Sequence, residues 1–122
     1  MKQTVAVLCL LAVLTGSVIW NALYINKVTT RFTEQVGNLP PFGDPACPAA
    51  AAALLSDWER VDARVELTAG YTLTDRAHEQ ASLLASCAAS GDAFGYASAY
   101  ALFRDALRDL ARAERFSPGS LF

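Results

Sequence analysis

The chain of 122 residues is poor in the residue types on which most enzyme active sites depend. It has one histidine, His78, and two lysines, Lys2 and Lys27, so a helical two-histidine zinc motif and a serine–lysine dyad in the later chain are both excluded. A glycine-rich phosphate loop, a calcium loop and a Gly-x-Ser-x-Gly elbow are missing as well. We therefore expect no enzyme activity and no cofactor.

Basic residues are scarce in the region that would form a domain outside a membrane. Residues 37–122 hold 11 acidic and 7 basic residues, a net charge of −4. Nucleic-acid binding requires a concentrated basic surface, so nucleic acid is not an expected partner. The chain also contains 23 alanines, which favour helix but bury little area each, and this composition predicts small helical packing.

Charged residues are absent from Thr4 to Ile25, a run dominated by Val, Leu, Ala and Ile. As a helix this run would extend roughly 33 Å, enough to cross the hydrocarbon core of a bilayer. Trp20 and Tyr24 lie one turn apart at its end, as in the aromatic belts of membrane–water interfaces. The run predicts a transmembrane helix and makes the lipid bilayer the first expected partner.

A cleaved secretory signal is the alternative interpretation of this run, because Lys2 followed by an apolar stretch also begins such signals. The one small-residue site, Thr15-Gly16-Ser17, would leave an apolar mature end, and the run is long for a signal core. We therefore expect an uncleaved anchor. Basic residues are nearly balanced on the two sides of the run, so the positive-inside rule does not decide the orientation. We take the default arrangement, with the short N-terminal tail inside, and expect a single-pass protein of the cell membrane with its C-terminal domain extracytoplasmic.

Small residues in the anchor offer a route to self-association. Ala12 and Gly16 form a small-xxx-small pair that would let two such helices approach closely and form a homodimer. The alternative is that the pair reflects the ordinary composition of an apolar helix, in which such pairs are common.

The remaining patterns predict an all-α protein in three segments. Residues 1–36 form the membrane anchor and a juxtamembrane helix, residues 37–47 a Pro/Gly-rich linker, and residues 48–122 a three-helix extracytoplasmic domain. Apolar residues recur at helical spacing in three stretches, beginning near Pro48, at Thr74 as an N-terminal cap, and at Asp92. Short connections between them predict an up-down-up bundle after the transmembrane helix.

Cys47 and Cys87 form an even pair outside the predicted anchor, which permits a disulfide in an extracytoplasmic domain. In an antiparallel hairpin, however, the two residues stand at different heights above the turn, and a bridge needs Cα atoms within roughly 7 Å. Free buried thiols are the alternative.

His78 stands beside acidic residues on one helix, Asp75 and Glu79, and such a cluster could bind a metal or move a proton. It lacks a second histidine or a cysteine, so a surface or boundary histidine bonded to a carboxylate is the simpler interpretation. Trp58, Tyr96 and Tyr100 could line a ligand groove between helices, but at helical spacing they are more simply core residues.

These features together resemble a known family. An N-terminal anchor, Trp58, the pair His78-Glu79 and the tail from Glu114 to Phe122 are similar to the domain-of-unknown-function 4363 family, single-pass proteins of Gram-positive spore-forming bacteria with a small helical outer domain. The resemblance covers most of the chain and brings no established activity. It implies that Trp58, His78, Glu79 and Glu114 form a structural or functional cluster, and we expect a contact between His78 and Glu114.

The sequence thus predicts a membrane-anchored helical interaction or structural module of the cell envelope that binds another membrane or envelope protein. A ligand-sensing ectodomain acting through a membrane partner is the alternative, and a pocket lined by Trp58, Tyr96 and Tyr100 would favour it.

Overall fold

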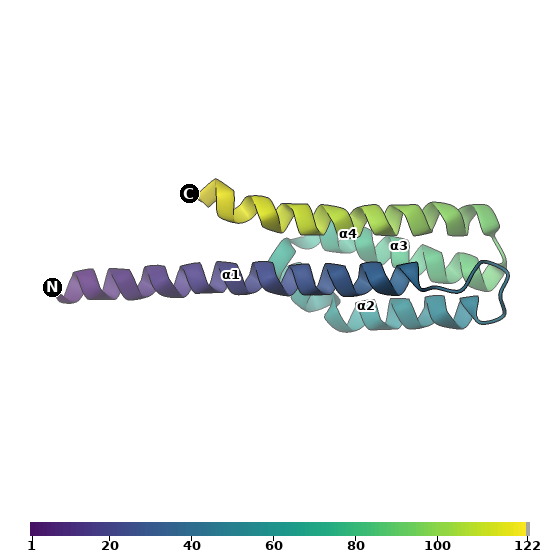
Figure 1. The fold of residues 1–122 in the computed structure, drawn as a ribbon, viewed down its shortest axis with the longest axis horizontal. Helices are drawn as coiled ribbons and strands as arrows, with labels where there is room; N and C mark the ends of the chain where they lie inside the picture. Colours follow the sequence, from purple (N-terminus) through teal and green to yellow (C-terminus); the bar gives the residue numbers. More distant parts are fainter. Residues whose placement is uncertain (122) are drawn as a thin grey trace.

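Four α-helices make up the fold in a computed structural model that describes residues 1–121, with side chains described at all of these positions except 68 and 114–121 (Figure 1). In chain order the helices are α1 (Lys2–Gly37), α2 (Cys47–Ala69), α3 (Tyr71–Ser90) and α4 (Ala93–Leu121), and the described residues contain no strand. The predicted fold class is confirmed: a long apolar N-terminal helix is followed by three packed helices.

The first helix, α1, is continuous over 36 residues and is therefore about 54 Å long. It is the one helix in the described part of the chain that is long and apolar enough to cross a membrane, and none of its apolar stretch is buried in the protein. Its second half behaves differently: Ile25, Val28, Phe32 and Val36 are buried, each at most 6% exposed. The first half of α1 therefore projects beyond the other helices, and its second half packs against them.

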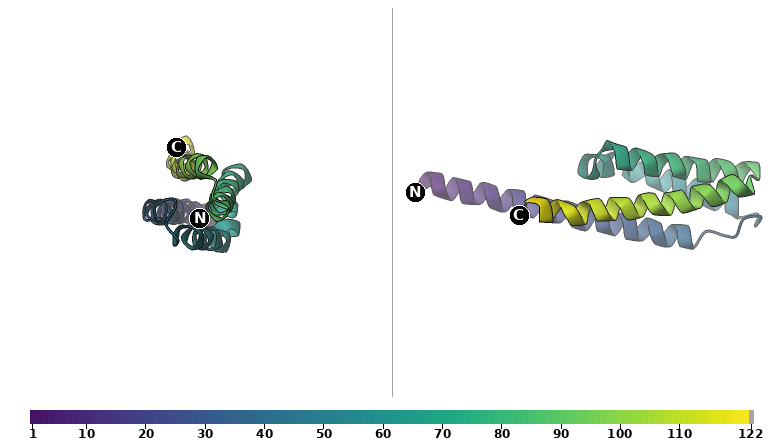
Figure 2. Two further views of the ribbon diagram at one scale, coloured as in Figure 1. Left: turned by 90° about the vertical axis from the view of Figure 1, so that its right-hand side faces the viewer. Right: turned by 90° about the horizontal axis from the view of Figure 1, so that it is seen from above.

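The second half of α1 completes an antiparallel four-helix bundle. Viewed along the bundle, α1 packs against α2 and α4, and α3 packs against the same two helices from the other side (Figure 2). The Pro/Gly-rich segment predicted at 37–47 connects α1 to α2 at the end of the bundle remote from the projecting half of α1. It is therefore a connection between two bundle helices, and no spacer separates the apolar half of α1 from the bundle.

Two glycines make the other connections short. Gly70 has a φ of 98° and ψ of 159°, a conformation that side chains disfavour, and it alone separates α2 from α3. The predicted cap at Thr74 is wrong, because α3 begins at Tyr71 and the buried Thr74 hydroxyl donates back to the Gly70 carbonyl at 2.8 Å. Gly91 ends α3 in the left-handed region, as is common at helix C-termini.

Asp92 caps the last helix, as its sequence position predicts. Its Oδ1 atom accepts a hydrogen bond from the Gly95 amide at 3.0 Å, which satisfies one of the free N–H groups in the first turn of α4. The cap fixes where α4 begins, and α4 then runs back along α1 towards the projecting end (Figure 1).

The core follows the predicted apolar stripes and has an aromatic centre. Trp58 on α2 is fully buried and packs edge-on against Phe32 of α1 and Phe103 of α4, with ring centroids 5.1 and 5.9 Å apart. Alanines fill the narrower stripe of α3, where Ala77 and Ala81 are fully buried. Because α3 presents small side chains, its neighbours can approach closely, and the large rings supply the burial that alanine cannot.

Candidate membrane-facing site

A groove lies where the projecting half of α1 meets the bundle. Its volume is about 440 Å³, within the range of small-molecule sites. Its lining comes from one face of α1 and from one turn of α2, namely Trp20, Leu23, Tyr24, Lys27, Val28 and Arg31 with Val61 and Arg64. The groove therefore begins on the exposed apolar helix and ends against the bundle.

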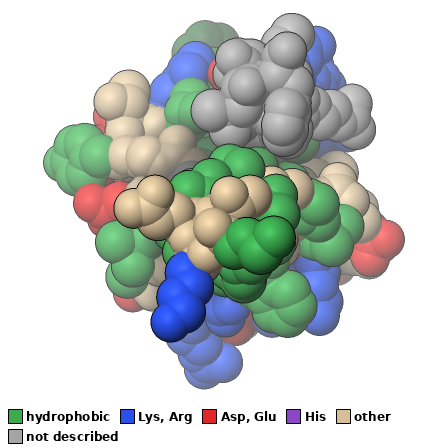
Figure 3. Space-filling model, turned by 90° about the vertical axis from the view of Figure 1, so that its left-hand side faces the viewer, with side chains coloured by type: hydrophobic (Ala, Val, Ile, Leu, Met, Phe, Trp, Pro, Cys, Tyr) green, Lys and Arg blue, Asp and Glu red, His purple; other side chains and the backbone are tan. Residues whose placement is uncertain are grey.

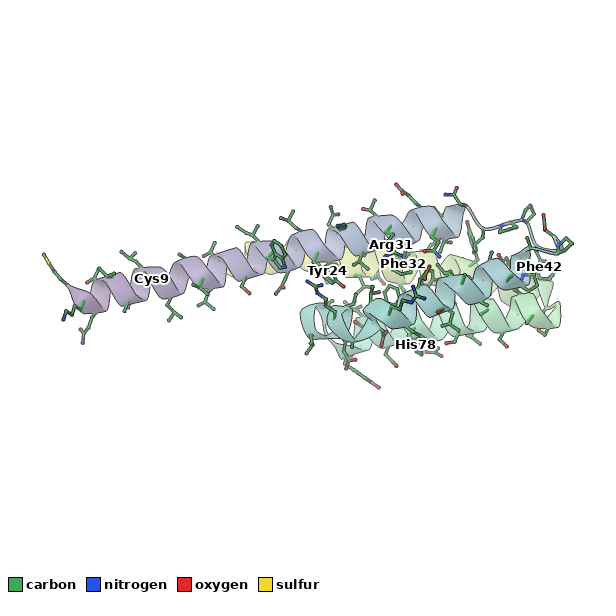
Figure 4. The ribbon with its side chains drawn as sticks, turned by 90° about the horizontal axis from the view of Figure 1, so that it is seen from below. Cys9, Tyr24, Arg31, Phe32, Phe42 and His78 are labelled. Atoms are coloured by element: carbon green, nitrogen blue, oxygen red, sulfur yellow. The ribbon has the colours of Figure 1, made fainter. Side chains whose placement is uncertain are left out.

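An aromatic ring and a guanidinium group join the two walls. The Arg64 Cζ atom of α2 stands 4.2 Å from the centre of the Tyr24 ring of α1, a close cation–π contact. Arg31, next along the groove, lies 5.5 Å from the ring of Phe32. Figure 4 shows Tyr24 and Phe32 pointing from α1 towards the other helices, with Cys9 far out on the projecting half.

The charges of the lining have one sign. Lys27, Arg31 and Arg64 are all exposed, and among the described residues no Asp or Glu belongs to the groove's lining. Three cations around one cavity attract an anion, and guanidinium groups in particular match the geometry of phosphate or carboxylate. The apolar lining of Trp20 and Leu23, which are 65% and 62% exposed, would suit an attached hydrocarbon.

The end of the bundle on the same side also exposes apolar residues. Leu67 and Tyr71 flank the Gly70 turn between α2 and α3 and are 89% and 67% exposed. Seen from this end, the apolar side chains of α1 stand in front of the bundle, with Lys and Arg side chains on several sides of them (Figure 3). A surface of this kind is suited to the boundary between lipid and water.

The structure describes the side chains of three members of the cluster implied by the family resemblance, namely Trp58, His78 and Glu79. Trp58 is a core residue whose indole N–H donates to Asp62 at 2.9 Å. His78 is partly exposed, and its Nε2 atom lies 3.6 Å from a carboxylate oxygen of Glu59, one residue after Trp58. Glu79 is exposed. The Glu114 side chain lies outside the described residues, so the expected contact between His78 and Glu114 stays a prediction.

The carboxylate beside His78 comes from another helix. His78 pairs with a surface carboxylate of the neighbouring helix α2, and the described residues contain no group of three Cys, His, Asp or Glu side chains suited to holding a metal. The exposed position of the pair, with side chains 38% and 56% exposed, means that it adds little to stability.

The two cysteines of the bundle are free thiols in the structure, so the permitted disulfide is not formed. Cys47 is buried at the start of α2, and Cys87, near the end of α3, is partly exposed and faces Asp92, with Sγ and Oδ2 3.9 Å apart. Burial raises the pKa of the Cys87 thiol, and the negative charge and hydrogen bond of Asp92 raise it further.

The aromatic side chains considered for a ligand groove belong mainly to the core. Trp58 is fully buried, and Tyr96 is 7% exposed. Burial raises the pKa of Tyr96, as do the neighbouring Cys47 and Tyr100. A pocket centred on these rings was the feature that would have favoured a ligand-sensing ectodomain, and their burial removes that support.

The groove could have been foreseen in part. Trp20, Tyr24, Lys27 and Arg31 recur at spacings of four, three and four, which places them along one face of a helix. The contribution of Arg64 has no such signal, because it depends on α1 continuing into the bundle and packing against α2.

Comparison with family models, with curated proteins and with solved structures finds no match to this chain. The resemblance to the domain-of-unknown-function 4363 family therefore stays a prediction, and the functional argument rests on the chain's own residues.

Proposed function

We propose that this chain is a membrane-anchored helical module of the cell envelope that binds another membrane or envelope protein. The observation that carries the proposal is the continuity of α1, whose apolar half projects uncovered while its second half forms part of the bundle core. Exposed Val, Leu and Ile side chains over that length are unfavourable in water and favourable in lipid. The bundle is then held directly on the membrane, with its long axis set by the anchor.

The end of the bundle remote from the membrane offers a surface for a protein partner. Phe94, at the start of α4, is 87% exposed, and Phe42, in the connection before α2, is 39% exposed and packs on Tyr96 with ring centroids 5.3 Å apart. Exposed aromatic side chains are the type most enriched at protein interfaces. We propose that the remote end of the bundle, which exposes both of these rings, contacts the partner.

The proposal assigns no catalysis to the chain and places the bundle on the extracytoplasmic side of the cell membrane. The assignment of no catalysis is supported by the surface position of the single histidine, His78, whose Nε2 atom lies 3.6 Å from a carboxylate oxygen of Glu59. Topology is tested by protease protection of the full chain in sealed vesicles or whole cells. We expect the bundle to be digested from the outside only.

Partner binding is tested by photocrosslinking in membranes, with a photoreactive phenylalanine analogue replacing Phe94 in the full chain. We expect a crosslink to an integral membrane or envelope protein. Leu83, a 45% exposed residue on α3, provides the matched control, and the same replacement there should give no such product. Recovery of the chain in a soluble fraction, or equal products from both positions, would contradict the proposal.

A further inference from the structure

We propose that the groove between α1 and α2 binds one anionic phospholipid from the leaflet that faces the bundle. The lipid phosphate would lie among Lys27, Arg31 and Arg64, and an acyl chain would follow Trp20 and Leu23 towards the bilayer centre. This inference rests on the proposed membrane anchoring and goes beyond it by naming a ligand class and its site.

The order of residues along α1 matches the order of chemical groups in a lipid. Trp20 and Leu23 belong to the uncharged run, Tyr24 closes it, and Lys27 and Arg31 follow about one and two turns later. The groove therefore changes from apolar to cationic along the axis of the helix that crosses the membrane. A phospholipid changes from hydrocarbon to phosphate along the same axis.

Arg64 turns a basic helix end into a defined site, because it brings a third cation from a second helix. Its guanidinium group is held 4.2 Å from the Tyr24 ring, on the wall opposite Lys27 and Arg31. The ring contact holds the guanidinium group on this wall of the groove, so that its positive charge adds to those of Lys27 and Arg31. The described residues of the lining include no Asp or Glu.

The position of the groove favours a lipid over a soluble anion or an acidic protein segment. Its apolar end is formed by residues of the predicted membrane span, where a water-soluble partner would have to displace lipid. The exposed Leu67 and Tyr71 at the neighbouring α2–α3 turn would also lie against the lipid surface. Anionic headgroups attract juxtamembrane Lys and Arg, at about fivefold in affinity for each basic residue.

Trp20 provides an intrinsic probe of the site. The full chain is reconstituted in phosphatidylcholine vesicles that contain a fixed fraction of phosphatidylglycerol, and the acyl chains of one lipid or the other are brominated to quench tryptophan fluorescence. We expect brominated phosphatidylglycerol to quench Trp20 several times more effectively than brominated phosphatidylcholine at the same mole fraction. The Trp20→Phe variant supplies the background signal of Trp58, which is fully buried in the core.

Arg64 and Arg60 form a matched pair for the decisive comparison, because they lie one turn apart on α2 and only Arg64 lines the groove. Arg64→Gln should lower the preference for phosphatidylglycerol about fivefold, the effect of one basic residue at an anionic surface. Arg60→Gln, at a residue whose side chain is 78% exposed and pairs with Asp57, should leave the preference unchanged. Lys27→Gln, on the other wall, should act like Arg64→Gln.

Each outcome separates the lipid site from the membrane anchoring on which it depends. If the chain inserts into vesicles but both lipids quench Trp20 equally, or if Arg60→Gln acts as strongly as Arg64→Gln, the lipid site is wrong and the anchoring stands. If the chain fails to insert and stays in solution, the proposed function itself is wrong. Circular dichroism melting of each variant confirms that the bundle is folded in every comparison.

Discussion

The ring of Phe32 packs edge-on against the ring of Trp58, with centroids 5.1 Å apart and planes inclined by 75°. Phe32 belongs to the same continuous helix as the exposed apolar run, and Trp58 is the central residue of α2. The contact therefore joins the helix that carries the exposed apolar run to the core of the bundle without an intervening linker.

Replacing Phe32 by alanine should destabilise the bundle strongly, because Phe32 is fully buried and the substitution leaves a cavity beside Trp58. We expect a loss of about 3–5 kcal/mol in the free energy of unfolding, as for other buried Phe→Ala changes. Denaturant unfolding of the full chain in detergent micelles, followed by Trp58 fluorescence in a Trp20→Phe background, measures it. Phe42→Ala, at a residue 39% exposed, should cost clearly less. Equal losses would show that α1 is not part of the core.

The two ends of the bundle should differ in their contact with lipid. Leu67 and Phe94 are 89% and 87% exposed, but they belong to opposite ends of the bundle. Leu67 is near the end of α2, on the side from which α1 projects, and Phe94 is at the start of α4, at the remote end. An environment-sensitive dye is attached to Leu67→Cys or to Phe94→Cys in a chain freed of its own cysteines. On reconstitution into vesicles, we expect a blue shift of the emission from position 67 and none from position 94. The reverse pattern would contradict the placement of the groove at the membrane.

The thiol of Cys87 should react slowly near neutral pH and faster when Asp92 is neutralised. Burial and the Asp92 carboxylate raise the thiol pKa, which reduces the fraction of reactive thiolate below that pKa. Asp92→Asn removes the charge but keeps an efficient cap for α4. We expect faster alkylation of Cys87 at pH 8 in Asp92→Asn, measured by mass mapping in a Cys9→Ala background. An unchanged rate, with helix content preserved, would mean that Asp92 does not control the thiol.

Self-association of the anchor can be read from Cys9, which is exposed and lies near the face of α1 that carries Ala12 and Gly16. A side-chain atom added at Gly16 would meet nothing within 4 Å, so this face has space for a second helix. Oxidation of the membrane-inserted chain, with Cys47 and Cys87 replaced by alanine, should give a disulfide dimer through Cys9. The double variant Cys9→Ala, Leu11→Cys moves the thiol to another face of α1 and should give no disulfide dimer. Equal dimer yields would contradict a specific interface.

Most of the helical architecture could be predicted from periodicity. Apolar residues at helical spacing are buried on each helix, as with Leu54, Trp58 and Val65 on α2 and Phe103, Leu107 and Leu110 on α4. These positions were predictable because each helix must bury one apolar face, whichever neighbour covers it. Phe32 and Val36 on α1 follow the same helical spacing, four residues apart, and both are fully buried.

Which neighbouring helix covers each apolar face was harder to predict than the position of the face on its own helix. Proline and glycine in residues 37–47 suggested a spacer between anchor and domain, but they also suit a connection at the end of a bundle, and composition does not distinguish the two. Thr74 has the chemistry of a cap, yet Gly70 already provides the break, so Thr74 falls inside α3. The groove shares this dependence, since Arg64 reaches Tyr24 only through the packing of α2 on α1.

Cysteine accessibility along α1 tests most directly whether one helix both crosses the membrane and enters the bundle core. Single cysteines are placed at each position from 26 to 36 in an otherwise cysteine-free chain in membranes, and are labelled with a membrane-impermeant maleimide. Low labelling is expected at Val28, Phe32 and Val36, which are buried, and high labelling at Lys27 and Arg31, which are exposed. Uniform labelling across these positions would mean that the helix leaves the membrane as a free linker and would contradict the account.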